Sequence, residues 1–120
     1  MRDVLAPAAE RGHLEIRPRV VDRVGWRAAT GVTGVVRHSL GRFARHDLPE
    51  VSSRVDGGHV RLDVDLAVAW GTSLADVSAA VQREVASRVH TLTGLVVDSV
   101  DVTVGSVVVP GEQTTTGRVT

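Results

Sequence analysis

The residues that could do chemistry in this 120-residue chain are its aspartates and its five histidines. Asp63 and Asp65 are two positions apart, so on a strand they would share one face, with Asp101 expected on a neighbouring strand. Paired carboxylates can bind a cation or serve as general acid and base. Regular alternation with apolar residues already explains them, however. We therefore interpret them as part of a solvated face that Arg61 partly neutralises.

The other catalytic and metal-binding patterns are missing from the sequence. No cysteine occurs, which excludes disulfides, thiolate zinc sites and cysteine nucleophiles. There is no HExxH, no GxSxG and no phosphate-loop motif. The histidines have no metal-ligand spacing and are interpreted as exposed polar residues: His13, His38, His46, His59 and His90. We expect no catalytic residue, no cofactor, no metal site and no substrate, and hence a protein that is not an enzyme.

Two short segments could contact nucleic acid. Gly31-Val32-Thr33-Gly34 spells the GxxG of KH domains, but a helix end followed by a strand bulge explains it better, because it contains no basic residue. The second segment holds Arg37, Arg42 and Arg45, which could contact acidic lipid, nucleic acid or an acidic partner. The alternative interpretation of this segment is an ordinary solvated surface loop. A net charge of zero, with only two Trp and one Phe, makes nucleic acid an unlikely partner.

The length and composition fit one globular domain. Hydrophobic residues make up 42% and charged residues 23% of the chain, ordinary values for such proteins. Residues 1–10 are expected to form a flexible lead-in, residues 11–109 one domain, and residues 110–120 a flexible polar tail that starts with a proline. The apolar runs are far shorter than the ~20 residues of a membrane span, and no signal segment opens the chain, so we expect a cytoplasmic protein.

Hydrophobic periodicity divides the domain into two helices and five strands. Val60, Leu62, Val64, Leu66, Val68 and Trp70 fall on one face of the clearest strand. The second helix is predicted to start at Ser73, to carry one stripe (Leu74, Val77, Val81, Val85, Val89, Leu92) and to stop at Gly94. The full set of expected elements is a strand at 13–17, a helix at 18–30 with a left-handed cap at Gly31, a strand at 32–39, a hairpin of strands 51–55 and 59–70, the second helix, and a strand at 95–109 with a kink at Gly105.

These elements predict an α+β fold, a two-layer sandwich. Both amphipathic helices would pack on the apolar face of one sheet, because that arrangement buries every apolar stripe. Strong alternation favours an antiparallel sheet with one wet face. We therefore expect a mainly antiparallel sheet of four to five strands, with two helices on one face and the order β-α-β-β-β-α-β.

Two groups of segments resemble a known family. The first reads RGHLEIRPRVVDRV at 11–24 and RAATGVTGV at 27–35. The second reads VDLAVAWG at 64–71, VQREV at 81–85, TGL at 93–95 and VDVTV at 100–104. In this order and spacing they are similar to the core pattern of the alkaline shock protein 23 family of bacterial envelope stress-response proteins.

The resemblance implies a non-enzymatic, self-associating scaffold. It would lie in the cytoplasm, peripherally at the inner face of the cell membrane, held there by a small membrane-anchoring protein. As contact residues we single out Arg61, Asp63 and Asp65 on the sheet face and Arg37, Arg42 and Arg45 on the loop. The alternative is a nucleic-acid-binding module that uses the loop from Arg37 to Arg45.

Overall fold

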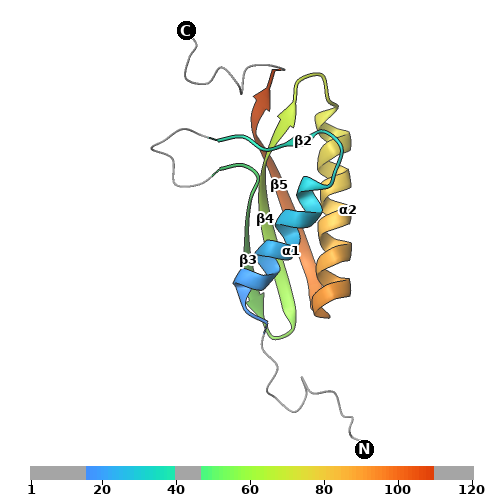
Figure 1. The fold of residues 1–120 in the computed structure, drawn as a ribbon. Coiled ribbons are helices and arrows are strands. Elements are labelled where there is room, and N and C mark those ends of the chain that lie inside the picture. The colour runs from blue at the N-terminus through green and yellow to red at the C-terminus, as the bar shows by residue number, and fades with distance from the viewer. Residues whose placement is uncertain (1–15, 40–46, 110–120) are drawn as a thin grey trace, which may run out of the picture.

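The computed structural model describes residues 16–39 and 47–109 (Figure 1). Its elements are α1 (Pro18–Thr30), β2 (Val35–Val36), β3 (Glu50–Asp56), β4 (His59–Ala69), α2 (Leu74–Thr93) and β5 (Val96–Val108). The expected lead-in and tail lie outside the described residues. So does most of the strand predicted at 13–17, whose last two residues, Ile16 and Arg17, precede α1 without forming a strand.

β4 is the central strand of the sheet. β3 and β2 pair with it along one edge, both antiparallel, and β5 pairs with it along the other edge. The helices lie together on one face of this four-stranded sheet (Figure 1), which confirms the predicted α+β architecture. The β4–β5 pair is parallel over its whole length, because α2 carries the chain back before β5 begins.

β2 and β3 are two parts of one interrupted edge. Val36 pairs with Ala67 and Glu50 pairs with Asp65, so the edge resumes almost where it stopped. Residues 37–39 and 47–49 belong to neither strand, and an antiparallel bridge joins His38 to Leu48. The strand predicted at 32–39 was therefore too long. Gly34, with φ of 100°, turns the chain into β2, and the pairing ends after two residues.

The main core lies between β4 and the helices. Alternate residues of β4 are at most 1% exposed, and so are three valines of α2: Val60, Leu62, Val64, Leu66, Val68, Val81, Val85 and Val89. Three residues expected in the apolar stripes are instead exposed, because they lie at the ends of elements: Trp70 (67%), Leu74 (45%) and Leu92 (64%). A second, smaller cluster joins Leu48, Ala67 and Val108. Since Ala67 alternates with Leu66, this cluster lies on the opposite face of the sheet.

The predicted boundaries of both helices are confirmed. In α2, the Ser73 hydroxyl accepts a hydrogen bond from the backbone N–H of Asp76, and Gly94 ends the helix with φ of 78°. Gly31 was expected to be left-handed, and this was wrong: its φ is −82°. Its N–H donates to the Ala28 carbonyl and the N–H of Val32 donates to the Ala29 carbonyl, which tightens the last turn.

Two bulges interrupt the register of β5. Asp98 has no opposite residue on β4, because Val60 pairs with Val97 and Arg61 with Ser99. Gly105 is the second extra residue, which confirms the kink predicted there.

Candidate interaction surfaces

The face of the sheet opposite the helices is charged and is called the open sheet face here. Its strand register places the predicted contact residues side by side on β4, where Arg61 and Asp63 are exposed and Asp65 is half-buried. The same face carries residues of the neighbouring strands: Glu50, Ser52, Arg54 and Asp56 from β3, and Ser99, Asp101 and Thr103 from β5. The structure therefore brings together three of the six predicted residues.

Like charges stand directly opposite each other on the open sheet face. Glu50 pairs with Asp65, Asp63 with Asp101, and Arg54 with Arg61. Directly opposed like charges disfavour strand pairing. Such rows are an arrangement that a complementary charged partner would stabilise.

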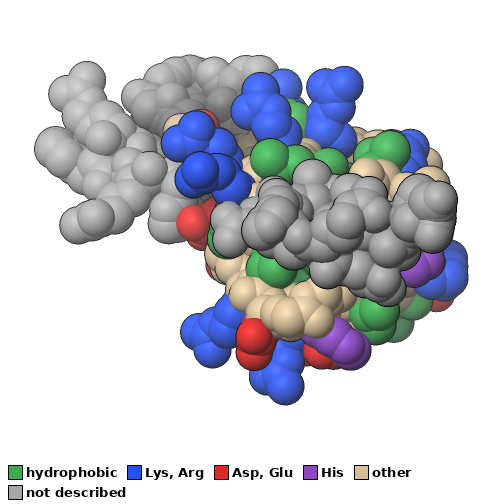
Figure 2. Space-filling view, turned by 90° about the horizontal axis from the view of Figure 1, so that it is seen from below, with side chains coloured by type: hydrophobic (Ala, Val, Ile, Leu, Met, Phe, Trp, Pro, Cys, Tyr) green, Lys and Arg blue, Asp and Glu red, His purple; other side chains and the backbone are tan. Residues whose placement is uncertain are grey.

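The hairpin end of this face is mixed in charge. His59 Nδ1 and Asp98 Oδ1 are 2.8 Å apart, and both side chains are partly exposed. They border a hollow with Arg54, Asp56 and Arg61. Figure 2 shows the molecule from below, the hairpin end of Figure 1. Arginine side chains protrude around its outline and alternate with acidic and histidine side chains at the lower edge. This end offers both signs of charge to a partner.

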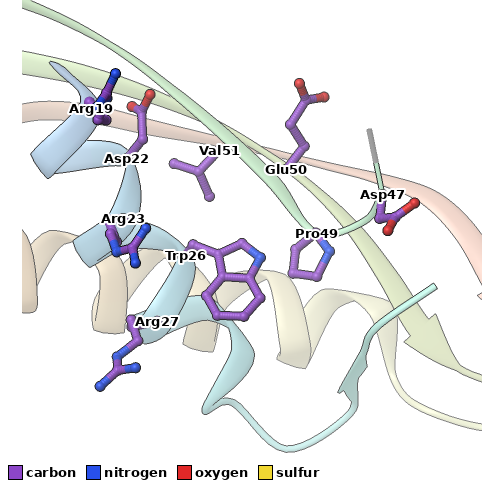
Figure 3. Close-up of a pocket in the computed structure, with 9 residues that line it drawn as sticks. All are labelled: Arg19, Asp22, Arg23, Trp26, Arg27, Asp47, Pro49, Glu50 and Val51. Atoms are coloured by element: carbon purple, nitrogen blue, oxygen red, sulfur yellow. The ribbon is translucent and has the colours of Figure 1, made fainter. Parts of the chain in front are cut away.

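A second surface follows α1 and is called the arginine face here. Arg19, Arg23 and Arg27 recur every four residues, so they lie along one side of the helix, and all three are exposed. They border a hollow of about 550 Å³ in which Trp26 packs beside Pro49 (Figure 3). The first turn of α1 contains no acidic residue. Asp22, Asp47 and Glu50 line the same hollow, so it is the exposed row of arginines, rather than the whole surface, that complements the acidic rows of the open sheet face.

One of the three predicted loop residues, Arg37, contacts Trp26, and the other two lie in the part of the chain that is not described. The guanidinium carbon of Arg37 lies 5.2 Å from the centre of the Trp26 ring, a cation–π distance. Arg37 thereby joins the arginine face rather than a separate loop patch. Arg42 and Arg45 lie outside the described residues.

Asp22 is the one acidic residue of α1. Burial raises the pKa of its carboxyl above the ordinary value, and a hydrogen bond with Ser53 opposes the shift. Its Oδ1 is buried without a hydrogen-bond partner in the described structure. The folded protein therefore pays a desolvation cost when this carboxyl is ionised.

In the described ranges, no group of three or more His, Asp or Glu side chains is placed to hold a metal ion. Neither of the helices seen in these ranges combines the length and apolarity needed to cross a bilayer.

The family comparison covers nearly all of this architecture. The family model for alkaline shock protein 23, described as having a cell envelope-related function, matches residues 6–109. The chain belongs to the alkaline shock protein 23 family. An uncharacterized protein of Bacillus subtilis (strain 168), YloU, is 29% identical over 106 residues, covering 80% of this chain and 88% of its own. The resemblance found in the sequence is thus confirmed, and the family's function relates to the cell envelope.

Solved structures are more distant. Two point variants of MamM-CTD align with TM-scores of 0.48, at 17% and 18% identity, and cover 75% of this chain and 98% and 99% of theirs. At this level of similarity no functional inference is drawn from them.

Sequence reasoning missed two features of these surfaces. The four-residue spacing of Arg19, Arg23 and Arg27 is visible in the sequence, but the same spacing is typical of the polar side of any amphipathic helix. No sequence pattern indicates the hollow at Trp26, because Pro49, which also lines it, is distant from Trp26 along the chain.

Proposed function

We propose that this protein is a non-enzymatic, self-associating scaffold of the cell envelope, held at the inner face of the membrane by a small membrane protein. The observation that carries the proposal is the separation of charge between the open sheet face and the arginine face. Although both faces carry charges of both signs, the acidic rows of one can attract the row of arginines of the other on a different copy.

In this arrangement, the acidic rows around Asp63 and Asp65 contact the arginines of another copy. Arg19, Arg23 and Arg27 supply the complement from α1, and Arg37 adds to them. A contact between two different surfaces of the same protein leaves one of each free, so copies can continue to add. Arg61 and the loop residues Arg42 and Arg45 belong to the proposed contacts as well.

The experiment is light scattering after size-exclusion chromatography, over a range of protein and salt concentrations. We expect assembly to grow with protein concentration and to shrink at about 1 M salt, where the screening length falls to about 3 Å. Replacing both Asp63 and Asp65 by asparagine should weaken assembly roughly tenfold, because two interface charges are lost. Glu84→Gln, an exposed change on α2, is the matched control. A protein that stays monomeric at every concentration would overturn the proposal.

Membrane attachment requires a cellular test. After lysis, the protein should be recovered with membranes and released by alkaline washing, as expected for a peripheral protein. Cross-linking before lysis should join it to one small membrane protein. Recovery wholly in the supernatant, with no cross-linked partner, would contradict the tethering part of the proposal.

A nucleic-acid-binding module is the second candidate, favoured by the row of exposed arginines on α1. Fluorescence anisotropy with single-stranded RNA and duplex DNA tests it. Binding that falls steeply with salt, and that is lost when Arg19, Arg23 and Arg27 are replaced by glutamine, would favour this candidate. The absence of binding at low salt would exclude it.

A further inference from the structure

The outer edge of β5 is the longest exposed strand edge in the described part of the protein. β5 has 13 residues and pairs with β4 on one side from Val96 to Val108. On its other side, no strand among residues 16–39 and 47–109 pairs with it. Unpaired backbone N–H and C=O groups on such an edge are templates for another strand.

Partly buried valines lie on the core face beside this same edge. The core residues of β4 are at most 1% exposed, whereas Val97, Val102 and Val104 of β5 are only partly buried against the core. α2 packs over β5 and α1 packs over β3 (Figure 1), so a helix covers the core face at both edges. The three valines nevertheless keep some apolar surface exposed beside the unpaired edge of β5.

The two bulges fix how much of β5 can pair regularly. Asp98 and Gly105 each disturb the strand, which leaves Ser99 to Val104 as a continuous regular segment. In this segment Val100, Val102 and Val104 point to the core face, and Asp101 and Thr103 to the open sheet face.

We infer that β5 pairs antiparallel with β5 of a second copy, with Val102 opposite Val102 of that copy. The inference rests on the proposed self-association and assigns it a surface. Opposite residues of an antiparallel pair point to the same face, so a twofold axis within the segment must pass through a residue position. The charges and the bulges then determine which residue can lie at the axis.

An axis at Asp101 would set two carboxylates directly against each other, which is unfavourable. An axis at Thr103 would place Asp101 against the bulge residue Gly105. An axis at Val102 avoids both problems, since Asp101 then faces Thr103 of the other copy and Val100 faces Val104. Paired in this way, the two sheets form one continuous sheet, and the partly buried valines cover each other.

One contact of α2 already reaches the β5 backbone. The side-chain amide of Gln82 donates a hydrogen bond to the Val100 carbonyl at 3.1 Å. This acceptor is therefore satisfied by a helix side chain rather than by a further strand. The pairing we infer leaves Gln82 in place or replaces its hydrogen bond by a backbone one.

The register can be tested by cross-linking, because the chain contains no cysteine. Val102→Cys should form a disulfide-linked dimer on mild oxidation, since the two introduced thiols face each other. Asp101→Cys and Thr103→Cys place their thiols two residues out of register and should cross-link at least tenfold more slowly. Fast linking of Asp101→Cys or Thr103→Cys instead would overturn the assigned register.

Substitutions of opposite charge at Thr103 should change the affinity of the dimer in opposite directions. Thr103→Lys should strengthen the dimer and Thr103→Asp should weaken it, each by about tenfold, because two symmetric contacts to Asp101 change together. Thr103 also faces Asp65 within one copy, so thermal unfolding at dilute concentration must be measured separately. Ser52, exposed on the same face at the opposite edge of the sheet and facing Asp63 within one copy, is the matched control: Ser52→Lys and Ser52→Asp should leave the affinity of the β5 pairing unchanged.

Salt separates this inference from the proposed function. Contacts between charged faces should dissociate at about 1 M salt, whereas a dimer held by backbone pairing and valines should persist there. An assembly that falls to monomers at high salt, with no cross-linking of Val102→Cys, would overturn the β5 inference and leave self-association through the charged faces. A monomer under all conditions would overturn both.

Discussion

Gly25 offers a quantitative test of how closely α1 approaches the sheet. It is buried in the middle of α1, and a Cβ atom there would lie 3.1 Å from Val51 Cγ1 and 3.3 Å from Leu62 Cδ2. These distances are shorter than ordinary van der Waals contact. Leu62 is 1% exposed and belongs to the central strand, so it has little room to move. The helix itself would have to move away from the sheet.

Two opposing effects set the size of the change in Gly25→Ala. Alanine in place of glycine inside a helix gains about 1 kcal/mol. Overpacking a close-packed site costs about 1–3 kcal/mol. We expect a net decrease of about 1 kcal/mol in the free energy of unfolding, which for a domain of this size lowers Tm by about 4–8 °C.

Urea and thermal unfolding followed by circular dichroism measure this change. Gly31→Ala is the control, because Gly31 has an ordinary φ of −82° and a Cβ there would meet nothing closer than 3.6 Å. It should be neutral or slightly stabilising. Combining Gly25→Ala with Val51→Ala should recover part of the loss, since the shortest contact is removed. A Gly25→Ala variant that gains the full helix-propensity increment would refute the close approach.

Two further variants test features of the fold. Asp22→Asn should stabilise the protein at neutral pH. Because the pKa of Asp22 is raised in the folded protein, ionisation of this carboxyl lowers the free energy of unfolding as the pH rises above the ordinary value of 3.8. In urea unfolding, the advantage of the variant should therefore disappear below that pH. An advantage that grew on acidification would contradict this sign. Gly34→Ala should lower the free energy of unfolding by about 2–5 kcal/mol, since it combines a φ of 100° with a Cβ 2.8 Å from the Thr72 side chain. Gly58 has a φ of 86° but open space around it, so Gly58→Ala should lose only the backbone contribution to the free energy of unfolding, about 1–2 kcal/mol. Equal losses in Gly34→Ala and Gly58→Ala would show that the Thr72 contact is unimportant.

Local signals explain why the sequence predicted the helices and the central strand well. Ser73 and Gly94 act through their own hydrogen bonding and backbone conformation, and the alternation along β4 reflects burial of a single strand. The interruption after Val36 could not be predicted, because it depends on β4 accepting two separate segments along one edge. The parallel β4–β5 pair likewise depends on where α2 returns the chain.

The candidate surfaces were predicted less completely, for a similar reason. Asp63 and Asp65 were placed together because they share one strand. Asp101 was expected on a neighbouring strand and pairs with Asp63, whereas the position of Glu50 opposite Asp65 depends on register, which the alternation of one strand does not determine. Arg37 was assigned to a loop, whereas its contact with Trp26 ties it to α1.

The interrupted edge provides a natural insertion point in this fold. Because the strand direction and register continue from Val36 to Glu50, and a bridge joins His38 to Leu48, the sheet does not depend on how many residues lie between them. Each doubling of such a segment costs only about 0.6 kcal/mol in loop entropy. Evolution could therefore lengthen or recode this segment to suit different neighbours, and an epitope tag or small reporter domain grafted there would leave the open sheet face undisturbed.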